Sequence, residues 1–154
     1  MTAGFIAFGV MILVFAIAVR ARLESAAWIT LTITALATLG VAATPLDWSD
    51  SIDQIHGLFA GTGYVTLAST PLLAYGRLRG AGAHGLARAG VVAGAVAAVA
   101  LALSGTDVTT GLFQRLGLTV VDLWIMALAI WLMRTPTVDA RTNETADVSM
   151  TESR

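Results

Sequence analysis

The chain has 154 residues, of which 56% are hydrophobic and only 12% charged, and its formal net charge is −1. Soluble domains carry about 25% charged residues, so this composition leaves too little polar surface for a domain that faces water on all sides. The small net charge provides no basic field for nucleic acid, and the absence of cysteine excludes disulfides and thiolate chemistry.

Five apolar segments follow one another along the chain, at residues 3–19, 26–43, 55–76, 86–104 and 111–133. Each is close to the roughly 20 residues that cross a hydrocarbon core as a helix, and such uninterrupted runs exclude the alternating pattern of barrel strands. The sequence therefore predicts an all-α fold, an integral membrane helical bundle of five transmembrane helices over residues 1–134. Residues 135–154 are polar and predict a disordered cytoplasmic tail.

The charged residues are distributed unevenly between the two sides of this predicted bundle. If the segments alternate in direction, one side carries Arg20, Arg22, Arg77, Arg79, Arg88 and Arg134. The other side carries Asp47, Asp50, Asp53 and Asp107, with Arg115 as its single cation. The positive-inside rule then places the N-terminus outside and the C-terminus in the cytoplasm. We expect the chain to be a multi-pass protein of the cell membrane, with the lipid bilayer as its first partner.

Two stretches carry short motifs. The first, LGVAATPLDWSDSIDQIHGLFAGTGYVTLASTPLLA, contains the pair His56-Gly57, and the second, GLFQRLGLTVVDLWIMALAIWLMR, begins with Gly111, Leu112 and Arg115 in a Gly-Leu-x-x-Arg pattern. In these motifs the chain resembles the bacterial and archaeal membrane family catalogued as domain of unknown function 998, over roughly Met1 to Arg134. The resemblance implies a six-span architecture whose first span this chain lacks. It implies no established activity.

The segment before the third apolar run contains acidic and histidine side chains at intervals of three, namely Asp47, Asp50, Asp53 and His56. Each step of three turns an α-helix by about 300°, so the four side chains do not form one row. Asp53 and His56, one turn apart, remain candidate metal ligands, but a closed site needs about four ligands. The alternative is that Asp53 caps the helix and that His56 bonds a neighbouring span.

The fifth apolar segment contains Asp122 close to its midpoint. A charge there costs at least ~2.5 kcal/mol, so we expect Asp122 to face protein and to have a partner or to be protonated. Tyr64, at a similar depth in the third segment, is a candidate partner. These considerations predict a polar column between the third and fifth helices, formed by His56, Tyr64, Gln114, Arg115 and Asp122. It is interpreted either as interhelical hydrogen bonding or as a polar pocket or ion path.

Two pairs of glycines have the four-residue spacing that allows helices to approach closely in membranes, Gly57 with Gly61 and Gly90 with Gly94. Contacts within the chain are favoured over dimerisation for both pairs, because they lie in consecutive predicted spans.

The sequence leaves three functional classes open. The first is a structural or interaction subunit of a membrane assembly, which would use a partner helix or a second copy of the chain. The second is a small carrier or channel-like protein that uses the polar column. The third is an enzyme that acts on lipid, although no nucleophile–base pair, dense ligand set or phosphate-binding loop supports it. No cofactor is predicted.

Overall fold

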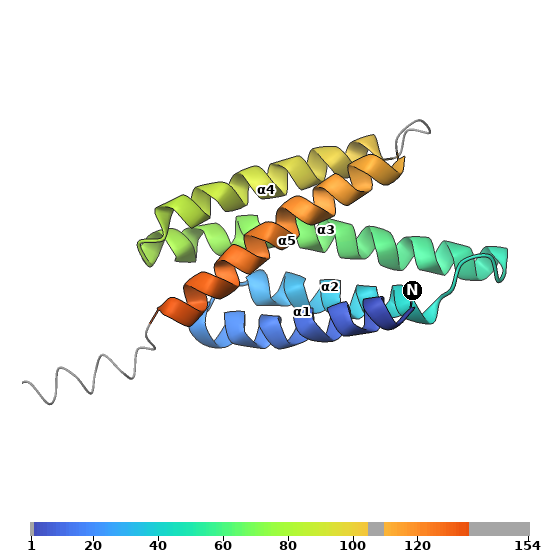
Figure 1. The fold of residues 1–154 in the computed structure, drawn as a ribbon, viewed down its shortest axis with the longest axis horizontal. Coiled ribbons are helices and arrows are strands. Elements are labelled where there is room, and N and C mark those ends of the chain that lie inside the picture. Colours follow the sequence, from blue (N-terminus) through green and yellow to red (C-terminus); the bar gives the residue numbers. More distant parts are fainter. Residues whose placement is uncertain (1, 105–109, 136–154) are drawn as a thin grey trace, which may run out of the picture.

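The computed structural model describes residues 2–104 and 110–135, and this part of the chain forms five helices and no strand. The helices are α1 (Thr2–Leu23), α2 (Ala27–Ala43), α3 (Asp50–Gly80), α4 (His84–Leu103) and α5 (Thr110–Arg134) (Figure 1). The predicted all-helical fold is confirmed. Asp107 and, apart from Thr135, the predicted tail lie outside the described residues.

Three of the helices, α1, α4 and α5, are long and apolar enough to cross a membrane. Only 22% to 33% of the most apolar stretch of each is buried inside the bundle, so most of this apolar surface faces outward, as it does in a helix that lies in lipid. Helix α2 is apolar but shorter, with 17 residues, and α3 has 31 residues but is more polar. The chain is therefore a multi-pass membrane protein.

Each helix packs mainly on its neighbour in the sequence. Helix α3 lies in the middle, with the α1–α2 hairpin on one side and α4 on the other, and α5 crosses α3 obliquely (Figure 1). In the described part of the chain α1 and α5 are not packed along one another. They diverge toward the end of the bundle where the N-terminus and the start of α3 lie (Figure 1).

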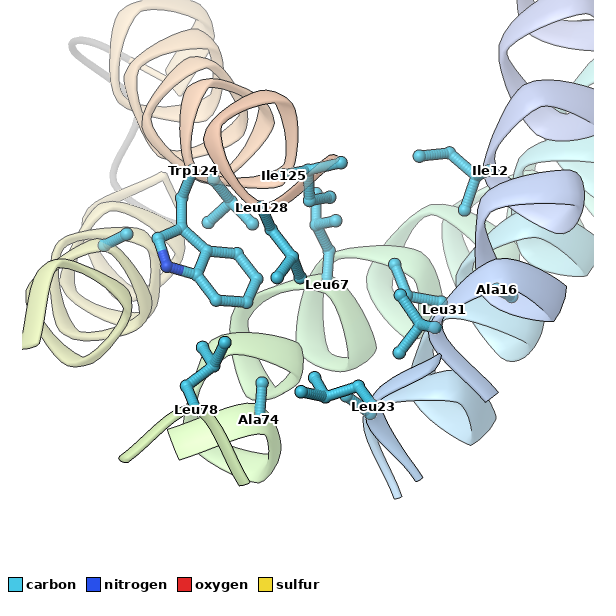
Figure 2. Packing of buried hydrophobic residues seen from close by; sticks show 14 of the residues in the cluster. Ile12, Ala16, Leu23, Leu31, Leu67, Ala74, Leu78, Trp124, Ile125 and Leu128 are labelled. Carbon is cyan, nitrogen blue, oxygen red and sulfur yellow. The ribbon is translucent and has the colours of Figure 1, made fainter. Parts of the chain in front are cut away.

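The core is built from aliphatic side chains and small residues. Leu31, Leu78 and Leu128 are fully buried, and Figure 2 shows Leu67, Ile125 and Leu128 meeting where α5 crosses α3. Such interdigitated packing gives these helices a fixed register.

The contacts of α4 depend on two glycines. A Cβ atom on Gly90 would lie 2.8 Å from Nε1 of Trp124, and one on Gly94 would lie 2.8 Å from the carbonyl oxygen of Ala68. Trp124 lies against α4 because its indole N–H donates to the Leu86 carbonyl over 3.0 Å. Both glycines thus let α4 approach α3 and α5 closely.

The other glycine pair behaves differently from the prediction. A Cβ atom on Gly57 or Gly61 would meet no atom within 4 Å among the described residues. The close approach to another described helix that was expected for these two residues is therefore not present.

Threonines join α2 to α3. The hydroxyl oxygens of Thr34 and Thr66 are 2.7 Å apart, and those of Thr30 and Thr70 are 2.8 Å apart. Thr66 donates its proton to the Thr62 carbonyl of its own helix, so Thr34 must be the donor to Thr66, since a hydroxyl has only one proton. This ladder fixes the rotation of α2 relative to α3.

Candidate functional site

A cleft of about 260 Å³ lies where α1 and α5 diverge. Helices α2 and α3 form its floor, and the first turns of α1 and of α5 contribute side chains from opposite sides. The walls are mostly apolar, with phenylalanines prominent among them. The lining residues are Phe5, Phe8, Thr34, Thr38, Val41, His56, Phe59, Ala60, Gly63, Tyr64, Leu67, Gln114 and Leu118.

The polar groups of the cleft come from three helices. The Tyr64 hydroxyl on α3 is within hydrogen-bonding reach of the Gln114 side-chain amide on α5. Thr38 on α2 donates its proton to the Thr34 carbonyl over 2.8 Å. A smaller cavity of about 10 Å³, lined also by Ala97 of α4, adjoins the same tyrosine and glutamine, and this volume suits about one water molecule.

His56 is oriented by the loop between α2 and α3. Its Nδ1 lies 2.6 Å from the Thr44 carbonyl oxygen. A carbonyl can only accept, so Nδ1 carries a proton, and in the neutral ring Nε2 is then an acceptor. The ring is thus held in one orientation at the margin of the cleft, with Nε2 left for another group.

The structure brings part of the predicted polar column together. His56, Tyr64 and Gln114 all line the cleft, whereas Arg115 and Asp122 do not. One residue further along a helix is a rotation of about 100°, and Arg115 is accordingly exposed. Asp122 is eight residues beyond Gln114, about 80° around the helix.

The expected pairing of Asp122 with Tyr64 is wrong. Tyr64 is directed to Gln114 instead, and the buried Oδ1 atom of Asp122 has no hydrogen-bond partner among the residues that the structure describes. The helical register explains the difference, because the rotation that turns Gln114 toward α3 carries Asp122 to a neighbouring face of α5.

The candidate metal ligands are engaged with the backbone of the loop. Oδ1 of Asp53 accepts from the amide of Asp47 over 3.0 Å, while Ser49 provides the helix cap by accepting from the amide of Ile52. Within residues 2–104 and 110–135 no group of three potential metal-binding side chains occurs. Asp53 and His56 both tie the loop to the beginning of α3, and the cap expected of Asp53 is made by Ser49.

Sequence reasoning missed the threonines and the two phenylalanines of α1. The signal for the threonines was present, because Thr30, Thr34 and Thr38 recur every four residues, as do Thr62, Thr66 and Thr70, and a four-residue spacing places side chains on one helix face. Phe5 and Phe8 gave no such signal, since one apolar residue in an apolar helix resembles another.

The fold and the cleft together define a multi-pass, all-helical membrane protein with a mainly apolar recess between its helices. The family described as protein of unknown function (DUF998) matches residues 1–131, and the chain belongs to this family. No curated protein and no solved structure matches the chain.

Proposed function

We propose that this protein binds a small, membrane-soluble molecule in the cleft between α1, α2, α3 and α5, as a carrier or binding protein would. The observation that carries the proposal is that His56 and Tyr64 of α3 and Gln114 of α5, a helix distant in the sequence, line one recess with aromatic walls. Ligand sites combine mostly apolar walls with a few converging polar groups in this way. Polar side chains are costly at membrane depth, so a convergence of several favours a functional role.

The proposal includes five spans, with the N-terminus outside and the C-terminus in the cytoplasm of the cell. Its support is that α1 and α3 end in arginines, Arg20 with Arg22 and Arg77 with Arg79, whereas α3 begins with Asp50 and Asp53. Since α1 and α3 run in the same direction (Figure 1), their basic ends lie at one end of the bundle. The cleft then lies in the outer half of the membrane.

The test is to fill the cleft and ask which molecule is lost. Ala60 lines the recess, and a cavity of about 150 Å³ already accommodates a benzene ring, so an Ala60→Phe side chain fits the 260 Å³ available. The matched control is Ala98→Phe, on a face of α4 that is exposed to lipid. Each protein is purified in lipid nanodiscs, and the small molecules are extracted and measured by mass spectrometry.

We expect one compound in near-equimolar amount with the wild-type protein and with Ala98→Phe, and its loss from Ala60→Phe. Identical extracts from all three proteins would refute a ligand site in this cleft.

A second candidate, the interaction subunit, is favoured by the bare face of α3. Gly57 and Gly61 have no neighbour there within the described residues, and Leu58 beside them is 69% exposed. Small residues at this spacing let a partner helix approach closely in a membrane. The partner would be a helix of another protein or a second copy of the chain.

Single-molecule photobleaching at low density in lipid tests self-association. If a second copy docks on this face, Gly61→Leu should convert dimers to monomers, whereas Gly76→Leu, an equally open glycine of α3, should not. Unchanged dimers in Gly61→Leu, or monomers throughout, would remove self-association through this face.

A further inference from the structure

We propose that the cleft selects a neutral amphiphile whose head is a hydroxyl group on a unit about the size of one ring and whose apolar tail leaves between α1 and α5 into the lipid. This inference rests on the proposed function, because it names the class of molecule that the same site would hold. Three properties of the recess favour such a molecule, namely its charge, its hydrogen-bonding capacity and its shape.

The described residues that line the cleft include no aspartate, glutamate, lysine or arginine. Asp122 and Arg115 belong to other faces of α5, and Asp53 is directed to the loop. An ionic head would therefore lie among neutral groups at membrane depth without a counter-charge, which is strongly unfavourable. The recess thus disfavours carboxylates, phosphates and ammonium heads.

Several polar side chains of the cleft have no proton left to donate to a ligand and can act only as acceptors. Thr38 has given its proton to the Thr34 carbonyl, and the Thr34 hydroxyl has given its own to Thr66. The His56 ring uses Nδ1–H on the Thr44 carbonyl, which leaves Nε2 as an acceptor. Thr34 is buried and paired with Thr66, so two polar side chains in the recess, Thr38 and His56, are left that can only accept from a ligand.

The remaining pair, Tyr64 and Gln114, can both donate and accept. A ketone, an ether or an ester head can accept from this pair but offers no proton to Thr38 or to the imidazole. A hydroxyl does both. The complement of the recess is therefore an alcohol or a phenol rather than a carbonyl compound.

The shape limits the size of the head and indicates the path of the tail. A volume of about 260 Å³ exceeds the ~150 Å³ that holds benzene but lies below the ~300 Å³ at which drug-sized pockets begin. Phe5, Phe8 and Phe59 provide aromatic surface for a flat head. Because α1 and α5 are not packed along one another, a longer apolar chain can pass between them.

The experiment compares three probes with the same tail, namely 4-decylphenol, 4-decylanisole and 4-decylbenzoate. The anisole keeps the ring and the oxygen but has no proton to donate, and the benzoate adds a negative charge. Binding to the full chain in nanodiscs is followed as the rise in thermal unfolding temperature with the mole fraction of probe in the lipid. In Ala60→Phe the cleft is filled, so any change in its unfolding temperature measures the effect of each probe on the membrane alone.

The matched variants are Thr38→Val and Thr32→Val. Both threonines are on α2 and both donate to the carbonyl four residues earlier, but only Thr38 lines the cleft. We expect 4-decylphenol to bind about fivefold more tightly than 4-decylanisole, which corresponds to one hydrogen bond of about 1 kcal/mol. Thr38→Val should remove most of this difference and Thr32→Val should preserve it.

Two outcomes overturn the inference separately from the function. If 4-decylphenol and 4-decylanisole bind equally and Ala60→Phe abolishes the binding of both, the cleft is a ligand site that does not distinguish a hydroxyl from an ether. If 4-decylbenzoate binds most tightly, the cleft is an anion site. Binding of none of the three above the Ala60→Phe background would reject the hydroxyl head and count against a cleft ligand altogether.

Discussion

At the scale of single residues, Asp122 is the side chain whose environment fits it least. Its Oδ1 atom is buried without a partner in the described part of the chain, and Tyr64, the partner expected from the sequence, is directed to Gln114. A carboxyl group near the middle of an apolar helix costs about 2.5–3.5 kcal/mol on insertion scales. A side chain placed at such a cost is a candidate for a functional role.

This environment predicts the effect of replacing Asp122. Because no described residue would lose a hydrogen-bond partner, Asp122→Leu should stabilise the folded protein by about 1–3 kcal/mol. Asp122→Asn should stabilise it less, since the amide is still polar. Thermal unfolding in one detergent measures both effects. A large destabilisation by Asp122→Leu would mean that Asp122 has a partner in the membrane. This result would contradict the conclusion that its carboxyl group is unpaired.

At the scale of helices, the two glycine pairs have opposite surroundings although their spacing is the same. Gly94 faces the backbone of α3, where a Cβ atom would lie 2.8 Å from the Ala68 carbonyl oxygen, a rigid neighbour, while Gly61 faces open space. The identical substitution therefore has different consequences at the two positions.

We expect Gly94→Ala to destabilise the protein by about 1–3 kcal/mol, the usual cost of overpacking. Gly61→Ala should leave the stability unchanged or raise it slightly, because alanine favours the helix more than glycine does. Thermal unfolding in detergent compares the two, and equal effects would contradict the close contact between α3 and α4.

The helices themselves could be predicted from the sequence, because an apolar run of about 20 residues has few alternatives in lipid. The predicted 55–76 segment is the least accurate, since α3 begins at Asp50 and ends at Gly80. Its ends are polar, so hydropathy alone could not reveal them, although Ser49 is a typical cap.

The site could be predicted only in part. The depth of a residue in the membrane can be predicted by counting residues along its span. This count placed His56, Tyr64 and Gln114 in one predicted group. Rotation of α5 about its axis depends on packing with α3 and α4, where Gly90 admits the Trp124 ring. That rotation separates Asp122 from Tyr64, and a single apolar sequence does not specify it.

At the scale of the whole molecule, the expected orientation can be tested in a chain that has no cysteine. Ser51 lies near the start of α3 and Ala81 just after its end, and both are exposed. An impermeant maleimide added to sealed cells should label Ser51→Cys and spare Ala81→Cys until the membrane is opened. Labelling of Ala81→Cys in sealed cells would reverse the proposed topology.

The dominance of contacts between sequence neighbours has a consequence for biosynthesis. Helices α1 and α2 pack together, α2 packs on α3, α3 on α4, and α4 on α5. Each helix therefore meets its main partner as soon as it leaves the translocation machinery, and no early helix must wait for a distant one. The α2–α3 threonine pairs can form before α4 is synthesised, and the cleft is completed only when α5, the last of the five described helices, arrives and supplies Gln114.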